Sequence, residues 1–245
     1  MISKIISLQK NDFNNDGSIK FSSLLTYMQN GALEDAEKYG ATHENLAKDN
    51  MFFAVYRNTL KIVKDPSPFI NELVLVTFQS SHDRMKFTRS YFIYEVGKEP
   101  DITKDFNPYE NAIIFCNSVW VLMDLNKRCL LRATELKYPV EEYTIQVDRI
   151  PKILKNDDKL KLKGEFVGNK YFIDENGHVN NAHYANIVFD YASKKIKIEN
   201  FDIIYEHEIL PDTEVNVYVE ETPMGEKLFG IRKADNEGCF CAEIY

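Results

Sequence analysis

The chain has 245 residues, of which 44% are hydrophobic and 13% aromatic, so it can bury the core of one large domain or of two smaller ones. Its formal net charge of −8, with no dense basic segment to offset it, argues against a nucleic-acid-binding protein. No apolar run is long enough to span a bilayer, and Lys4 interrupts the apolar start, so the sequence predicts a cytoplasmic protein without a signal peptide.

The first half of the chain predicts a helix followed by a meander of antiparallel strands. A strand is expected near Ile2 to Leu8, then a turn from Asp12 to Ser18. Apolar residues at helical spacing predict a helix from Phe21 to Tyr39, and Gly40 follows its end, where glycine is common. Three runs rich in Val, Ile, Phe, Tyr and Thr then predict strands: residues 51–64, residues 72–96 with a turn at 80–84, and residues 111–124.

The second half repeats this order after a connector that contains Pro139 and Pro151. We expect an N-terminal domain at 1–135, a linker at 136–159 and a C-terminal domain at 160–245. The second half predicts a strand at 160–172, a turn at 173–179, a helix from about 181 to 195, and strands at 201–209, 213–221, 227–233 and 238–245. The repeated plan favours an α+β protein in which each long helix packs against one curved antiparallel sheet.

The most informative segment is the turn of the second half, Asp-Glu-Asn-Gly-His-Val-Asn-Asn-Ala-His-Tyr at residues 174–184. It brings together an acid, several amides and an imidazole where a helix begins. Its Asn-Gly pair is a turn signal, and either asparagine after the valine can cap the helix. Because the first amides of a helix lack partners within it and lie at the positive end of its dipole, we expect those near residues 180–182 to stabilise an oxyanion.

The corresponding turn of the first half lacks the imidazole. Aligned on a shared Asp-x-Asn, residues 12–16 match residues 174–178, and Asp16 stands where the second turn has His178. Taken alone, residues 12–23 also resemble a calcium loop of the EF-hand type, but the last position is a serine where a bidentate glutamate is required. We therefore interpret the first turn as a degenerate copy of the second.

The motif Asp-x-Asn-x-His-Val-Asn-Asn-x-x-Tyr at 174–184 resembles the signature of the acyl-acyl carrier protein thioesterases, a double-hotdog family. Residues 23–29 resemble the first-helix pattern of that family, and residues 120–128 resemble its strand-turn pattern. Residues 205–212 resemble its Tyr-x-x-Glu strand and the turn that follows. The resemblance implies a tandem hotdog fold of the bacterial type.

The resemblance also implies four catalytic residues: Asp174, Asn176, His178 and Glu208. Glu208 would take a proton from water, and His178 would share that proton or return it to the departing thiolate. Asn176 would orient the carbonyl or hold the imidazole tautomer. Attack by Asp174 to form an anhydride is an alternative to water attack, and the sequence leaves both open.

Four cysteines lie in or beside apolar strand-like runs, and we expect them to be reduced thiols without a catalytic role: Cys116, Cys129, Cys239 and Cys241. Some relatives carry a cysteine directly after the glutamate, where this chain has Ile209, so a cysteine nucleophile at that position is excluded. We expect no cofactor, and no metal site, because Cys239 and Cys241 have no second pair at zinc-ligand spacing.

The function that the resemblance implies is hydrolysis of fatty acyl-acyl carrier protein thioesters, which releases free fatty acid and ends chain elongation in fatty acid biosynthesis. Two alternatives are an acyl-CoA thioesterase of the hotdog class and a non-catalytic acyl-thioester-binding protein. The retained base and imidazole argue against the second. Chain-length preference and homodimerisation are left open.

The expected partner is an acyl carrier protein with a phosphopantetheine-linked acyl chain, and the N-terminal domain would contribute to the acyl pocket. Carrier proteins of this kind are acidic, so docking on an acidic body would need a local basic patch. Two basic clusters are candidates: Arg84, Lys86 and Arg89, and Lys194, Lys195 and Lys197.

Overall fold

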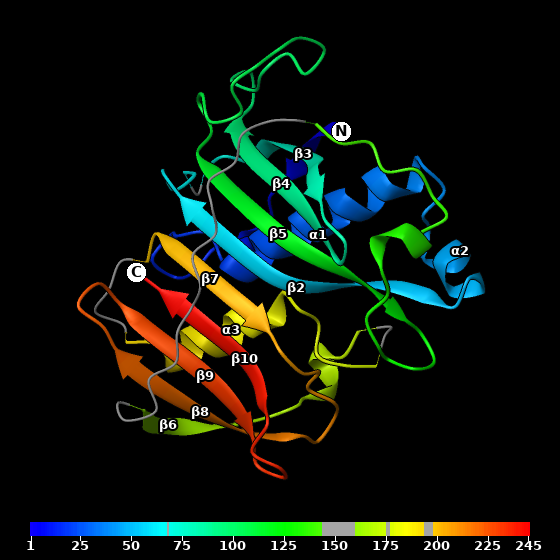
Figure 1. Cartoon of the computed structure of the whole chain (residues 1–245). Coiled ribbons are helices and arrows are strands. Elements are labelled where there is room, and N and C mark those ends of the chain that lie inside the picture. Colours follow the sequence, from blue (N-terminus) through cyan, green and yellow to red (C-terminus); the bar gives the residue numbers. More distant parts are fainter. Residues whose placement is uncertain (68, 144–159, 175–176, 194–197) are drawn as a thin grey trace. The chain divides into compact units, whose positions relative to one another are not determined.

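The structure is a computed structural model that describes residues 1–67, 69–143, 160–174, 177–193 and 198–245. The chain divides into two compact units, the first comprising residues 1–56 and 60–149 and the second residues 57–59 and 150–245. Within each unit, strands pair antiparallel into a sheet, and a helix lies against one face of that sheet (Figure 1). The predicted class, few helices with a large antiparallel sheet, is therefore confirmed.

The first unit orders its strands β1-β3-β4-β5-β2. Its elements are β1 (Ile2–Ser7), α1 (Phe21–Glu37), α2 (His43–Lys48), β2 (Met51–Ile62), β3 (Glu72–His82), β4 (Lys86–Glu95) and β5 (Ile114–Asp124). The helix α1 packs on β3 and β1 through its apolar face. A Cβ atom on Gly31 would lie 2.8 Å from Leu75 Cδ2, so this glycine lets α1 approach β3 closely.

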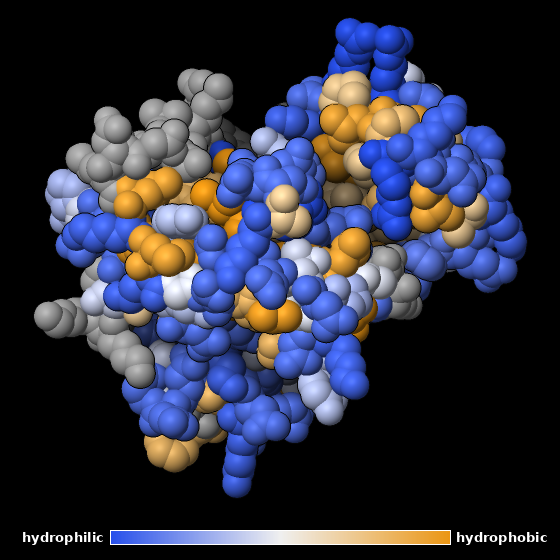
Figure 2. All heavy atoms as spheres, turned by 90° about the horizontal axis from the view of Figure 1, so that it is seen from below, coloured by the Kyte–Doolittle hydropathy of each residue, from blue (hydrophilic) through white to orange (hydrophobic). Residues whose placement is uncertain are grey.

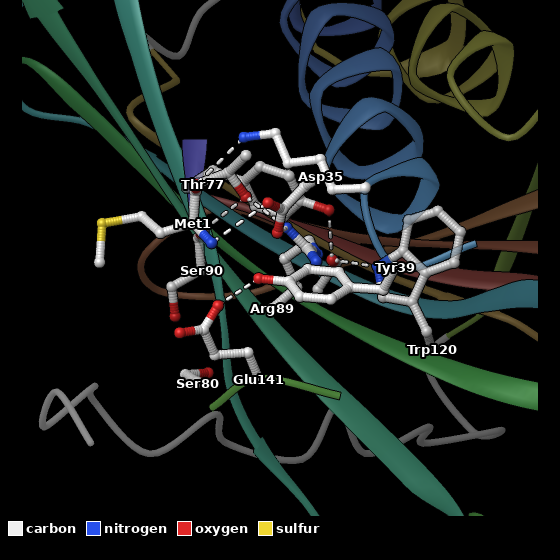
Figure 3. Close-up of polar contacts among 12 residues, drawn as sticks. Met1, Asp35, Tyr39, Thr77, Ser80, Arg89, Ser90, Trp120 and Glu141 are labelled. Atoms are coloured by element: carbon white, nitrogen blue, oxygen red, sulfur yellow. Dashed lines mark hydrogen bonds and ion pairs between the residues drawn. The ribbon is translucent and has the colours of Figure 1, made fainter. Parts of the chain in front are cut away.

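A buried polar network lies between α1 and the sheet of the first unit (Figure 3). Arg89 of β4 donates to Asp35 Oδ2 of α1 at 2.9 Å and to Thr77 Oγ1 of β3 at 3.3 Å, and all three residues are buried. A charge held in this way is satisfied internally and is shielded from a partner. Arg89 therefore cannot serve the predicted docking cluster, a correction that leaves only Arg84 and Lys86 at that turn.

The second unit orders its strands β7-β10-β9-β8-β6. Its elements are β6 (Lys161–Val167), α3 (His183–Tyr191), β7 (Asn200–Tyr205), β8 (Glu214–Glu221), β9 (Glu226–Arg232) and β10 (Gly238–Ile244). Four residues of α3 are buried at helical spacing: Tyr184, Ala185, Ile187 and Val188. The stripe they form faces the core, as the apolar periodicity predicts.

Two predicted strands of the second half are too long. The strand at 160–172 ends at Val167 and is followed by a 3-10 turn at Lys170–Phe172. The strand at 201–209 ends at Tyr205, because the amides of Glu206 and His207 both donate to Cys239 O, at 2.9 and 3.2 Å, and so break the regular ladder. Glu208 consequently lies in the segment after the strand.

The described part of the predicted linker packs on the first unit. Leu136 and Tyr138 join an apolar cluster around Phe87 and Leu122, and Tyr143 N donates to Gln79 O at 3.0 Å. The rest of the predicted linker lies outside the described residues, as do Lys194, Lys195 and Lys197 of the second basic cluster. The domain boundaries and that cluster thus stay predictions.

The face of the molecule in Figure 2 is largely polar. Hydrophilic side chains cover most of the face in Figure 2, interrupted by small apolar groups. Across the described parts of the chain, no helix has the length and apolar character needed to cross a membrane.

Candidate active site

The turn before α3 is held by three backbone hydrogen bonds. Asp174 N donates to His178 O at 2.9 Å, Gly177 N donates to Asp174 O at 3.0 Å, and Asn180 N donates to Phe172 O at 2.8 Å. Gly177 has φ of +84°, a conformation that glycine adopts without strain. Asn176 lies outside the described residues, so its role stays a prediction.

The side chains of His178 and Glu208 lie together at this turn. His178 Nε2 is 3.6 Å from Glu208 Oε1, and the two side chains are 12% and 44% exposed. His178 Nδ1 lies 3.2 Å from Val179 O. A proton on Nδ1 is placed to donate to this carbonyl oxygen, and Nε2 then faces Glu208, where a solvent molecule can reach the carboxylate.

The segment that carries Glu208 is fixed through its neighbouring residues. Val179 N donates to Ile209 O at 2.9 Å, and Ile209 N donates to Tyr184 Oη at 3.1 Å. On the other side, a Cβ atom on Gly168 would lie 2.1 Å from Leu210 O, so only glycine permits the observed approach of the end of β6. The carboxylate is thus presented by a segment tied to the turn, to α3 and to β6.

Asp174 is connected to the start of α3 by a contact with the side chain of Asn180. Asn180 Nδ2 is 3.5 Å from Asp174 Oδ2, and Asn180 Oδ1 accepts a hydrogen bond from Ala182 N at 2.9 Å. This contact forms a turn just before α3, whose N-cap residue is Ala182 without a side-chain hydrogen bond, so the predicted cap by an asparagine is wrong. The expectation that the Asn180 and Ala182 amides serve as oxyanion donors is wrong, since each already donates within the protein, Asn180 N to Phe172 O.

The first unit contains a turn with the same backbone bonding. Asn14 N donates to Ser18 O at 2.8 Å, Gly17 N donates to Asn14 O at 3.0 Å, and Lys20 N donates to Asp12 O at 2.7 Å. An isolated bridge closes each turn, Phe13 with Ile19 and Ile173 with Val179. Each position of the first turn thus corresponds to the position 160 residues later in the second turn.

This correspondence corrects the alignment made on Asp-x-Asn, which is wrong by two residues. Ser18, not Asp16, occupies the place of His178, and Asn14 occupies the place of Asp174. The two turn glycines, with φ of +85° and +84°, fall into register as well. The first turn therefore has no imidazole at the place of His178 and no carboxylate at the place of Asp174.

The four cysteines differ in burial, and none is adjacent in sequence to Glu208. Cys116, Cys239 and Cys241 are buried, whereas Cys129 is exposed. Burial raises the pKa of Cys239 to about 11 and that of Cys241 to about 12, so both thiols are protonated near neutral pH. The residue after Glu208 is Ile209, so no thiol adjoins the base.

Comparison with known proteins gives a consistent picture. The family model of the acyl-ACP thioesterase N-terminal domain matches residues 4–137, and that of the C-terminal domain matches residues 156–242. An acyl-ACP thioesterase from Bacteroides thetaiotaomicron has a similar solved structure, with a TM-score of 0.82 and 16% identity over 99% of this chain and 96% of that one. A 12:0-ACP thioesterase from Umbellularia californica has a TM-score of 0.78 and 16% identity over 99% and 95%. No curated protein sequence gives a significant match.

Proposed function

The chain belongs to the acyl-ACP thioesterase family, and we propose that it hydrolyses fatty acyl-acyl carrier protein thioesters at the turn of its second unit. The observation that carries this location is the pairing of His178 Nε2 with Glu208 Oε1 at 3.6 Å beside the start of α3. We further propose that the two units are tandem hotdogs. The shared turn, followed in each unit by a helix against an antiparallel sheet, supports this reading.

The proposed reaction is attack by water on the thioester carbonyl carbon. Glu208 accepts a proton as the water oxygen bonds to that carbon, and the carbon–sulfur bond then breaks. Glu208 passes this proton to His178 Nε2, and His178 delivers it to the departing thiolate of the phosphopantetheine arm, so that both side chains return to their starting states. A thioester carbon is electrophilic and a thiolate is a good leaving group, so a base and a positioned water suffice without a protein nucleophile.

Two features support water attack over an anhydride on Asp174. Glu208 is 44% exposed, so water can reach the base directly. Asp174 Oδ2 faces the side-chain amide of Asn180, whose Oδ1 accepts from Ala182 N just before α3, an arrangement suited to a carboxylate that organises the turn. We therefore assign Asp174 to site architecture and keep Asn176 as the group that orients the carbonyl.

The test is release of free fatty acid from a matched series of acyl carrier protein and acyl-CoA thioesters. We expect higher kcat/KM on the carrier-bound series. The double variant His178→Ala/Glu208→Gln supplies the background, since it lacks both proton-transfer groups. Equal or higher kcat/KM on acyl-CoA would favour the acyl-CoA thioesterase, and tight binding of acyl thioesters without hydrolysis would indicate a silent binding protein.

A further inference from the structure

The hydroxyl group of Tyr184 reaches the segment that carries the proposed base. Tyr184 belongs to α3, is 2% exposed, and accepts a hydrogen bond from Ile209 N at 3.1 Å. Ile209 O accepts in turn from Val179 N at 2.9 Å. The residue after Glu208 is therefore bonded on one side to the residue after His178 and on the other to Tyr184.

The ring of Tyr184 is held so that its hydroxyl has little freedom. Tyr205 and Phe240 both pack edge-on against it, with ring centroids 5.2 and 5.7 Å away. Burial raises the pKa of Tyr184, the hydrogen bond from Ile209 N opposes this rise, and the carboxylates of Glu208 and Asp174 add to it. The hydroxyl thus stays protonated near neutral pH, and it lies within electrostatic range of both site carboxylates.

The helix position equivalent to Tyr184 in the first unit is occupied by a residue that can only pack. The residue 160 positions before Tyr184 is Leu24, in α1, and it is fully buried at 0% exposure. The turn before it has neither an imidazole at the place of His178 nor a carboxylate at the place of Asp174. A leucine can therefore fill this position in the core, so packing alone does not require a hydroxyl group there. The unit that has the hydroxyl is the one with the candidate catalytic turn.

We propose that Tyr184 is a positioning residue for hydrolysis, whose hydroxyl holds the Ile209 amide and so directs Glu208 toward His178. This inference rests on the proposed function of the turn. A buried backbone amide needs an acceptor, and its loss would let the segment move to find another. A displacement of about 1 Å at a reacting group can cost up to about 10² in rate.

The test is Tyr184→Phe, which keeps the ring and removes only the hydroxyl. We expect kcat on an acyl carrier protein thioester to fall about tenfold or more, with KM nearly unchanged. The double variant Tyr184→Phe/Glu208→Gln should be no slower than Glu208→Gln alone, because Tyr184 acts through Glu208. Hydrogen exchange at the Ile209 amide should become faster in Tyr184→Phe.

The matched control is Tyr94→Phe in the first unit, which also removes a buried hydroxyl, one that donates to Pro108 O. It should lower Tm about as much as Tyr184→Phe and leave kcat unchanged. The inference is overturned if Tyr184→Phe retains wild-type kcat, if both variants lose activity equally, or if the double variant shows additive losses. Activity in Glu208→Gln would instead overturn the proposed function, so the two failures are distinguishable.

Discussion

The turns at residues 12–20 and 172–180 share their backbone hydrogen bonds across the described residues but differ in their side chains. Both are closed by the same three hydrogen bonds and the same bridge, and both place a glycine in the left-handed region. The second turn adds His178 and Asp174 where the first has Ser18 and Asn14. The turn is thus a structural element of both units, and the proposed catalysis depends on a few side chains that only the second turn carries at these positions.

The segments that face the two turns differ as well. In the second unit, Gly168 lets the end of β6 approach Leu210, and Tyr184 bonds to Ile209, so the segment with Glu208 is fixed on two sides. The corresponding residues of the first unit are Leu8 and Leu24, both buried and apolar. At both places the first unit therefore has apolar packing, whereas the second unit has contacts that fix the segment with the proposed base.

The largest expected effect comes from the base itself. Glu208→Gln keeps the shape of the side chain but cannot accept a proton at neutral pH, so kcat should fall by about 10² or more. Steady-state release of fatty acid from an acyl carrier protein thioester measures this. Glu206→Gln, two residues earlier and exposed, is the matched control and should retain wild-type kcat. Near wild-type turnover by the Glu208→Gln enzyme would show that Glu208 is not the base.

A smaller loss should follow from Gly168→Ala. The added Cβ would lie 2.1 Å from Leu210 O, so the segment with Glu208 must shift, and kcat should fall about tenfold. Leu8→Ala, at the corresponding place in the first unit, should lower Tm and leave kcat unchanged. The same loss of kcat in both variants would show that the two segments are not functionally different.

The smallest effect is expected from the thiols. Replacing all four cysteines by Ala or Ser should leave kcat within about twofold of wild type, since none adjoins Glu208. Iodoacetamide below about pH 9 should modify exposed Cys129 first, because the raised pKa values of Cys239 and Cys241 keep those thiols protonated. Loss of activity in one cysteine variant of unchanged Tm would call for a thioester-exchange mechanism.

Much of the fold could be predicted from the sequence because helix and strand periodicities are local. The helix from Phe21 and the glycine after it were predictable, and Gly40 indeed has φ of +82°. The short helix α2 was missed, although Thr42 at its N-cap accepts from Asn45 N and is a recognisable signal. Strand ends near Tyr205 were not predictable, since they depend on hydrogen bonds to Cys239 far along the chain.

The candidate site was predicted in its residues but not in its register. The recurrence of Asp-x-Asn in the two turns suggested that Asp16 replaces His178, whereas the backbone bonds place Ser18 there. Aligning the turns on Gly17 and Gly177 would have given the correct register, because the left-handed position is the one the turn geometry requires. The role of Tyr184 gave no such local signal, since its partner Ile209 is distant in sequence.

The most direct test of the account compares His178→Ala with Ser18→Ala, two substitutions at equivalent positions of the two turns. Single-turnover hydrolysis of an acyl carrier protein thioester isolates the chemical step from binding and release. The account predicts a rate lowered by about 10² in His178→Ala and within about twofold of wild type in Ser18→Ala. A slow Ser18→Ala enzyme beside a normal His178→Ala enzyme would place the reaction at the first turn and contradict the account.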